Sequence, residues 1–317
     1  MYDALLDEWA IPRPRELTRA SWGISNETWF VRSEAGEHVL RLYVQKRLEA
    51  IRFEHELLRR VATAELTFRT PVPVATEAGD TFAVEVDSAR PAALFRRIAG
   101  EHLNDDDVDG VERAAAAFAS LDIALGAIER TDFAVQVFSG DLRAVHPAIS
   151  DLAQLEEIAG LRARKFAEAA AENSPIIFSS LPTQLIHGDF SFGNVLIRAS
   201  RVRGVLDFEY AGWNVRALEL GGMLRNVLAK GNRERLWRPV LQGYLKTLSL
   251  DPAEIAALPA LVGFQSAITL VWWAGRIIEG HSRPQGLAEY VDRMVAMRDW
   301  VASNSIQLVA EALRASS

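Results

Sequence analysis

The chain changes character near residue 100, and this change constrains its fold more than any single motif. Before that point β-rich runs dominate, and TWFVRS (28–33) and HVLRLY (38–43) are joined by the turn-like EAGE (34–37), which predicts a hairpin. One helical segment, about 46–62, carries its apolar residues roughly on one face. After residue 100, alanine-rich and amphipathic helical patterns fill most of the sequence. We therefore expect an α+β fold with a small β-rich lobe and a larger, mainly helical lobe.

The length of the chain agrees with two lobes. At 317 residues it is longer than one typical domain, and 49% hydrophobic residues are enough for a substantial core. No internal repeat, low-complexity tail or long linker interrupts it. We predict an N-terminal lobe over residues 1–98 and a C-terminal lobe over residues 99–317, with the boundary near residues 97–102.

Composition excludes several kinds of partner and site. The net charge of −7 gives no general attraction for nucleic acid or for an anionic membrane, so we expect neither as a partner. The absence of cysteine excludes disulfides and thiolate metal sites. The N-terminal residues lack the basic-then-apolar layout of a signal peptide, so the expected location is cytoplasmic.

One apolar segment has the length of a membrane span. Residues 256–275 carry no charge, but Pro259, Gly263 and Gln265 interrupt them and Arg276 follows directly. We favour a buried helix of the helical lobe over a membrane helix.

Polar residues lie between two short strand-like runs in LIHGDFSFGNVLI (185–197). His187, Asp189 and Asn194 are spaced H-x-D-x-x-x-x-N, and Asp207-Phe208-Glu209 ends the next strand-like run. An aspartate on a tight loop can accept a proton from a substrate hydroxyl. Amide and carboxylate oxygens are ligands that Mg²⁺ accepts together with phosphate oxygens and water. An ordinary polar turn is the alternative, but the flanking strands and the second acid at hairpin distance favour a functional site.

This spacing is similar to the catalytic loop of protein kinases, with glycine in place of arginine. HGDFSFGNVL together with VLDFEYAGWNVRALELG resembles the aminoglycoside phosphotransferase and choline kinase superfamily, which includes bacterial homoserine kinases. The resemblance is strong across about residues 185–222. It implies a bilobal, protein-kinase-like fold and an ATP- and Mg²⁺-dependent kinase that phosphorylates a hydroxyl of a small molecule.

The resemblance also implies roles for individual residues. Asp189 would be the catalytic base or orient the hydroxyl, and His187 would support the loop through hydrogen bonds. Asn194 and Asp207 would be magnesium ligands. Glu209 would contact a second magnesium ion or the substrate, or else make a hydrogen bond within a loop.

The N-terminal lobe is expected to bind the nucleotide. SWGISNETWFV (21–31) resembles the G-x-[ST]-N element of the superfamily, so Ser25 and Asn26 are candidates for binding phosphate. Arg41 stands where protein kinases carry a strand lysine, and choline kinases resemble this chain in having arginine there. Glu54 is favoured over Glu56 as the acid that pairs with it. Adenine is expected against the backbone of about residues 95–98, which includes Arg96 and Ile98.

The acceptor is expected to bind the helical lobe. Candidate residues are Trp213, Trp272, Trp273, Arg276 and Glu279. A cationic amine could rest on tryptophan faces, whereas an arginine would suit a carboxylate, so an amino alcohol and a hydroxy amino acid both remain open. For each tryptophan alone, packing in the core is the simpler explanation. Two further alternatives are an aminoglycoside phosphotransferase and a catalytically silent nucleotide-binding protein.

Overall fold

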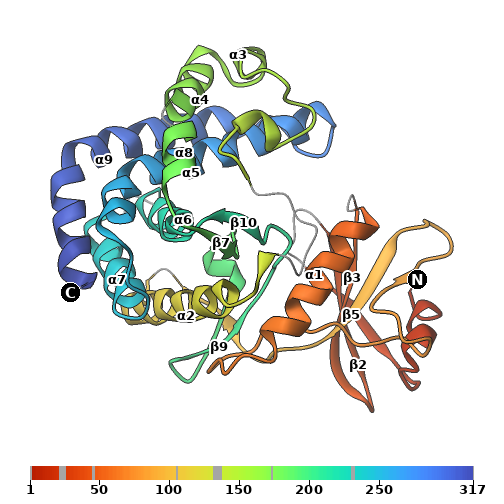
Figure 1. Ribbon diagram of the computed structural model, residues 1–317. Helices are drawn as coiled ribbons and strands as arrows, with labels where there is room; N and C mark the ends of the chain where they lie inside the picture. Colours follow the sequence, from red (N-terminus) through yellow and green to blue (C-terminus); the bar gives the residue numbers. More distant parts are fainter. Residues whose placement is uncertain are drawn as a thin grey trace. The chain divides into compact units, whose positions relative to one another are not determined.

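The computed structural model describes residues 2–20, 26–44, 47–104, 106–130, 138–172, 174–229 and 233–316 (Figure 1). The chain divides into two compact units. Unit 1 contains Met1–His102 and Asn194–Glu209, and unit 2 contains Leu103–Gly193 and Tyr210–Ser317. Residues 194–209 therefore belong to the unit built by the first hundred residues, although they lie far along the chain.

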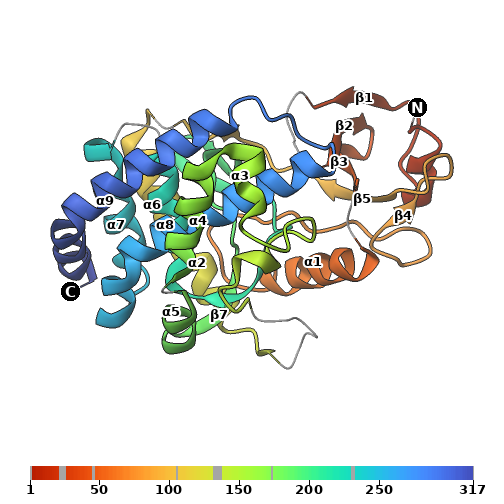
Figure 2. The same cartoon turned by 90° about the horizontal axis from the view of Figure 1, so that it is seen from above.

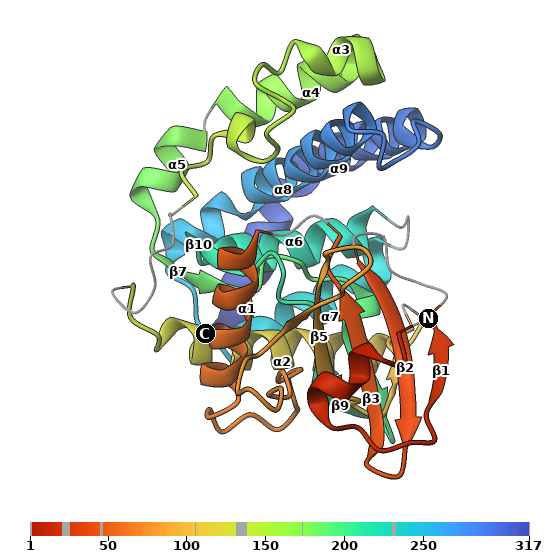
Figure 3. The same ribbon diagram turned by 90° about the vertical axis from the view of Figure 1, so that its right-hand side faces the viewer.

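A five-stranded antiparallel sheet is the larger sheet of unit 1. Its order is β1 (Glu16–Arg19), β2 (Glu27–Ser33), β3 (Gly36–Leu42), β5 (Pro91–Arg96) and β4 (Ala83–Val84). The predicted hairpin is confirmed as β2 and β3, in which Thr28 lies opposite Arg41. Figure 3 shows β1, β2, β3 and β5 side by side.

The two faces of this sheet differ in chemistry. On one face, Leu40 and Leu42 are buried together with Trp9 and the other apolar residues of the N-terminal segment, which contains the short 3₁₀ helix η1 (Leu5–Trp9). Side chains alternate between the faces of a strand, so Arg41 points to the opposite face. There its guanidinium lies 5.5 Å from the centre of the Phe95 ring. The sheet thus offers one apolar face to the core and one face that carries a cation.

Unit 1 is completed by a helix and a second sheet. Helix α1 (Leu48–Val61) corresponds to the segment expected at 46–62 and buries Ile51, Leu57 and Leu58. The second sheet has the order β6 (Glu101–His102), β8 (Val195–Arg198) and β9 (Arg201–Val205). This pairing joins the hairpin of residues 194–209 to the first part of the chain.

Unit 2 is mainly helical. The helical pattern of residues 150–172 is divided into two helices, because Gly160 has a φ of +85° and ends the first of them. Strands β7 (Thr183–Ile186) and β10 (Gly212–Val215) pair antiparallel. The helical elements are α2 (Val108–Gly126), η3 (Leu142–Ala144), α3 (Gln154–Ala159), α4 (Leu161–Glu172), α5 (Ser174–Ser180), α6 (Ala217–Leu228), α7 (Arg233–Leu245), α8 (Pro252–Ile278) and α9 (Leu287–Ser316).

Helix α8 contains the apolar segment 256–275. By length and composition alone this one helix among the described residues could cross a membrane, but 56% of its most apolar window is buried inside the protein. It contacts α4, α6 and α9, and Figure 2 shows α8 and α9 running side by side. These contacts are those of a core helix of unit 2.

Candidate active site

The loop that carries Asp189 follows strand β7 in unit 2. His187 is completely buried, and its ring meets that of Phe118 edge-on, with 5.1 Å between centres. The backbone N–H of Asp189 donates to Nδ1 of His187 over 3.3 Å. His187 thus holds the backbone of Asp189 through a hydrogen bond.

Gly188 explains why the loop has no arginine at this position. Its φ is +79°, and a Cβ atom would lie 2.7 Å from the carbonyl oxygen of Tyr210, so both the conformation and the space require glycine. Its N–H donates to Oε2 of the buried Glu219 over 2.8 Å. Glycine therefore lets the loop pass close to Tyr210 while Glu219, on α6, anchors it.

The proposed metal ligands lie at one end of the β8–β9 hairpin in unit 1. Val195 pairs with Val205, and the N–H of Leu206 donates to the carbonyl of Asn194 over 2.8 Å. Asn194 and Asp207 are therefore both at the end of the hairpin where this pairing stops. Asp207 has a φ of +66°, a left-handed conformation that aspartate and asparagine adopt more readily than most residues.

The hairpin end fits a divalent cation that is shared with phosphate groups. Oδ1 of Asp207 is buried and has no hydrogen-bond partner among the described residues. Among the residues that the structure describes, no three acidic or histidine side chains form a group that could hold a metal ion by themselves. Mg²⁺ is typically bound by one or two carboxylates plus phosphate oxygens and water, so one carboxylate and one amide are a suitable protein contribution.

Arg41 lies between two carboxylates of unit 1. Its Nη1 is 3.0 Å from Oε1 of Glu54 and 3.6 Å from Oδ1 of Asp207. Burial alone would lower the pKa of Arg41, but Asp207 and Glu54 outweigh it and raise that pKa. Glu56 instead pairs with Arg60 over 3.0 Å. A permanent cation is thus held between an acid on helix α1 and the acid at the hairpin end.

The remaining nucleotide candidates also lie in unit 1, except that Ser25 is outside the described residues. The side-chain amide of Asn26 donates to Oε2 of Glu209 over 2.9 Å. Three roles were left open for Glu209. This hydrogen bond from Asn26 corresponds to one of them, a hydrogen bond within a loop. Arg96 ends β5 with an exposed side chain, and Ile98 packs near Gly204.

Comparisons with known proteins assign the chain to a family. A sequence model of the phosphotransferase enzyme family matches residues 16–258, most of the chain. The chain belongs to this phosphotransferase family. The predicted superfamily resemblance is therefore confirmed.

Curated relatives of this phosphotransferase include homoserine kinases. Those of Methylorubrum populi and Rhodospirillum rubrum are 28% and 29% identical to it, and each alignment covers 81% of this chain and 79% of the relative. The family and these relatives identify the chain as a small-molecule kinase, which transfers a phosphoryl group to a hydroxyl.

Solved structures share its fold. A microcompartment-associated aminopropanol kinase superposes with a TM-score of 0.68 at 19% identity over 98% of both chains. An aminoglycoside phosphotransferase from Alicyclobacillus acidocaldarius has a TM-score of 0.68 at 17% identity, over 99% of this chain and 97% of the other. The predicted α+β, protein-kinase-like fold is confirmed.

The three candidate tryptophans of the phosphotransferase, all in unit 2, have different surroundings. Trp213 is buried on β10 opposite Leu185, and Trp273 meets the ring of Tyr290 with 5.6 Å between centres. Trp272 lies near the Asp189 loop through Tyr210, whose ring centre is 6.2 Å from that of Trp272 and whose carbonyl touches Gly188. Of the three, Trp272 has the clearest connection to the loop.

Arg276 covers the ring of Trp272. Its guanidinium carbon is 4.9 Å from the ring centre, its Nε donates to Oγ of Ser282 over 3.2 Å, and its Nη2 donates to the carbonyl of His281 over 3.4 Å. These contacts place a permanent cation on the tryptophan surface that a cationic amine would need.

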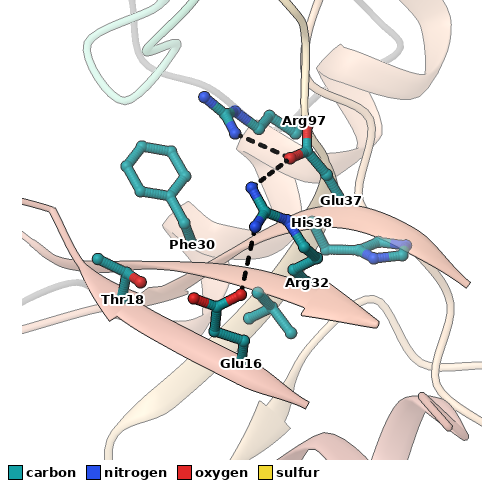
Figure 4. A pocket seen from close by; sticks show the side chains of 8 residues that line it. Glu16, Thr18, Phe30, Arg32, Glu37, His38 and Arg97 are labelled. Carbon is teal, nitrogen blue, oxygen red and sulfur yellow. Dashed lines mark hydrogen bonds and ion pairs between the residues drawn. The ribbon is translucent and has the colours of Figure 1, made fainter. Parts of the chain in front are cut away.

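A small pocket of about 50 Å³ lies on the main sheet of unit 1 (Figure 4). Phe30 lines it, two residues beyond Thr28 and so on the same face as Arg41. The guanidinium of Arg97 lies 4.8 Å from the centre of the Phe30 ring, and Glu37 pairs with Arg97 over 3.2 Å. An aromatic surface next to the segment expected to meet adenine is thus covered by an arginine.

Sequence reasoning did not identify a buried acid beneath the Asp189 loop. Asp122 on α2 is completely buried and accepts a hydrogen bond from the hydroxyl of Tyr244 over 2.5 Å. Burial, reinforced by the negative charge of Glu219, raises the pKa of Asp122 well above its ordinary value. Tyr244 follows Asp122 by more than a hundred residues, so no local pattern in the sequence indicates the pair.

The Asp122→Asn variant is expected to flatten the dependence of stability on pH. Because the pKa of Asp122 is raised in the folded state, the folded protein keeps a proton that the unfolded chain releases above about pH 4. Wild-type stability therefore falls as the pH rises from about 4 towards the folded-state pKa. Asparagine keeps the acceptor for Tyr244 and does not titrate, so the variant avoids this loss of stability. The Tm of the variant at pH 8 should exceed that of wild type by at least about 2 °C. Thermal melts between pH 5 and 9 measure this, and parallel curves for both proteins would contradict it.

Proposed function

We propose that this phosphotransferase moves the γ-phosphoryl group of ATP, with Mg²⁺, to the hydroxyl of a hydroxy amino acid or an amino alcohol, and that hydroxy amino acids are the preferred class. The observation that carries the reaction type is the anchored Asp189 loop together with the ion pairs of Arg41. In this proposal residues 1–98 bind the nucleotide and residues 99–317 bind the acceptor. A cytoplasmic location belongs to the same proposal.

The acid in the loop is assigned to the acceptor. Asp189 would orient the acceptor hydroxyl and take its proton as the bond to phosphorus forms. His187 and Glu219 hold the loop backbone on either side of the Gly188–Asp189 bond, which fixes the carboxylate before substrate arrives. In this role they position Asp189 and do not touch the reacting atoms.

The residues of unit 1 are assigned to the nucleotide. Arg41 would bind phosphate oxygens, and Ser25 and Asn26 would lie at the phosphates. The backbone at Arg96 and Ile98 would meet the adenine. When bound, Mg²⁺ neutralises phosphate charge, and Asn194 and Asp207 would hold it, with Glu209 as a further candidate. A solved amicoumacin kinase in complex with AMP-PNP and Ca²⁺ shares the fold, with a TM-score of 0.67 at 14% identity over 90% of this chain and 88% of the other, which supports a nucleotide–cation pair in this fold.

The surroundings of Trp272 favour an acceptor that carries a carboxylate. A cationic amine binds tryptophan through the face of the ring, but Arg276 already covers that ring and would repel a second cation. An arginine guanidinium binds carboxylates with two parallel hydrogen bonds. Glu279, one turn later in the chain, supplies an acid for an amino group. The homoserine kinases among the relatives agree with this choice. Trp213 and Trp273 would contribute walls to the acceptor site.

An ADP-release assay tests the acceptor class. Homoserine, 1-amino-2-propanol, choline and kanamycin would each be offered with Mg·ATP. We expect a kcat/KM for homoserine at least about tenfold above that for either amino alcohol. Turnover of kanamycin alone would overturn the proposed class, and tight ATP binding without turnover of any acceptor would favour a silent nucleotide-binding protein.

The Arg276→Gln variant separates acceptor binding from nucleotide binding. Loss of a charge-assisted hydrogen bond is expected to raise the KM for the hydroxy amino acid about 10- to 100-fold and to leave the KM for ATP within twofold. Arg143→Gln is the matched control, because Arg143 is an exposed arginine of the same unit and pairs with the nearby Asp141 over 2.8 Å. An unchanged acceptor KM in Arg276→Gln would refute the assignment of Arg276.

A further inference from the structure

A buried hydrogen-bond chain runs through unit 1 beside Arg41. The Tyr43 hydroxyl lies 2.9 Å from Nε2 of His55, and Nδ1 of His55 lies 2.8 Å from Oγ1 of Thr81. Tyr43 and His55 are each 1% exposed. Arg41, two residues before Tyr43, pairs with Glu54, which directly precedes His55. Both ring nitrogens of a buried histidine are thus engaged beside the ion pair of the nucleotide site.

Both hydroxyls in this chain can bond to a histidine ring nitrogen. Burial is the main cause that raises the pKa of Tyr43, so the phenol keeps its proton. A phenol and a threonine hydroxyl can each donate or accept, so either tautomer of His55 satisfies both bonds. One hydrogen-bonded chain therefore leads from Tyr43 through His55 to Thr81.

The chain joins the same two elements as the ion pair. Tyr43 follows Arg41 by two residues and continues the course of β3, with its N–H bonded to the carbonyl of Pro91 over 2.9 Å. His55 directly follows Glu54 on α1. Tyr43 and His55 are thus near neighbours of Arg41 and Glu54 in the sequence. Helix α1 is attached to the end of β3 at two points, by the Arg41–Glu54 ion pair and by the Tyr43–His55 hydrogen bond.

We propose that Tyr43 and His55 are positioning residues, which hold Glu54 opposite Arg41 for nucleotide binding. This inference rests on the proposed nucleotide site. A single ion pair leaves a long arginine side chain several arrangements, and Asp207 offers Arg41 a competing partner 3.6 Å away. The Tyr43–His55 bond restricts these arrangements, because it attaches α1, and with it Glu54, at a second point.

The Tyr43→Phe variant tests the proposal. It keeps the ring and removes the hydroxyl, which breaks the bond to Nε2 of His55 and so removes one attachment of α1 beside Glu54. We expect the Kd for Mg·AMP-PNP, measured by calorimetry, to rise about 5- to 10-fold. In a Glu54→Gln background, where Arg41 has already lost its pair, the same substitution should change the Kd less than twofold. A role in stability alone predicts no such dependence on Glu54.

The Trp9→Phe variant is the matched control. It also removes one partly buried hydrogen bond from unit 1, from Nε1 of Trp9 to the carbonyl of Val74 over 3.0 Å, but on the apolar side of the sheet. It should lower Tm and leave the Kd within twofold. His55→Gln, which can still accept from Tyr43, should bind more tightly than His55→Leu.

The outcomes distinguish this proposal from the proposed function. Wild-type protein that binds no Mg·AMP-PNP would overturn the nucleotide site and this inference with it. Wild-type binding with an unchanged Kd in Tyr43→Phe would overturn the inference alone. If Tyr43→Phe does not fold, Thr81→Val applies the same test from the far end of the chain, with an expected two- to threefold rise in Kd and with an unchanged Kd as the refuting result.

Discussion

Replacing Asp189 by asparagine is expected to lower kcat about 10³-fold. Asparagine has nearly the same shape but cannot accept the proton of the acceptor hydroxyl at neutral pH, and general base catalysis typically contributes 10²–10⁴-fold. The loop itself should survive, because His187 and Glu219 anchor it through the backbone N–H groups of Asp189 and Gly188, which the substitution keeps. Steady-state ADP release with the best acceptor measures the loss, and the Kd for Mg·AMP-PNP should stay within threefold.

Asp292→Asn provides the control for Asp189→Asn. Asp292 is an exposed acid of the same unit, paired with the exposed Arg162 over 2.6 Å, so its loss should change kcat less than twofold. A kcat for Asp189→Asn within a few-fold of wild type would show that another group accepts the proton.

Asp207→Asn should have the second-largest effect, a fall of at least about 10²-fold in kcat/KM for ATP. The substitution removes the carboxylate from the hairpin end and one of the two acids beside Arg41. Asparagine tolerates the left-handed φ of +66° about as well as aspartate does, so the backbone should keep its course. Kinetics over a range of Mg²⁺ concentrations should show a higher half-saturating concentration than in wild type.

Asp3→Asn is the control for the hairpin acid. Asp3 is a half-exposed acid of unit 1 that pairs with Arg13 over 3.0 Å. It should leave both the nucleotide kinetics and the Mg²⁺ dependence unchanged. An unaltered Mg²⁺ requirement in Asp207→Asn would remove Asp207 from the cation site.

The fold was predictable where the pattern is local. The β2–β3 hairpin follows from alternating β-rich residues around a turn, and α1 follows from its apolar face. Strand β1 was not singled out, because ELTR is short and polar and becomes a strand only by pairing with β2. The break between α3 and α4 depends on the φ of a single glycine, Gly160, inside an otherwise helical pattern.

The candidate site shows the same division. Asp189, Asn194 and Asp207 lie at fixed spacings along one stretch of chain, so a sequence motif can identify them. The contacts of Arg41 with Glu54, and of His55 with Tyr43 and Thr81, arise only when the chain folds. The partnership of Asp122 with Tyr244 likewise requires the tertiary fold. Spacing therefore identifies His187, which positions Asp189 from within the motif, and misses pairs such as Asp122 and Tyr244 that lie far apart in the chain.

The membership of residues 194–209 in unit 1 has a consequence for protein synthesis. Strand β6, at residues 101–102, must wait for β8, which the ribosome adds after α2 through α5 and β7. Pairings between such distant segments form slowly compared with local ones. The emerging chain should therefore hold an unfinished β edge while helices of the other unit are already being made. Unit 1 therefore cannot reach its final form until residues 194–209 have been made, long after its first 102 residues.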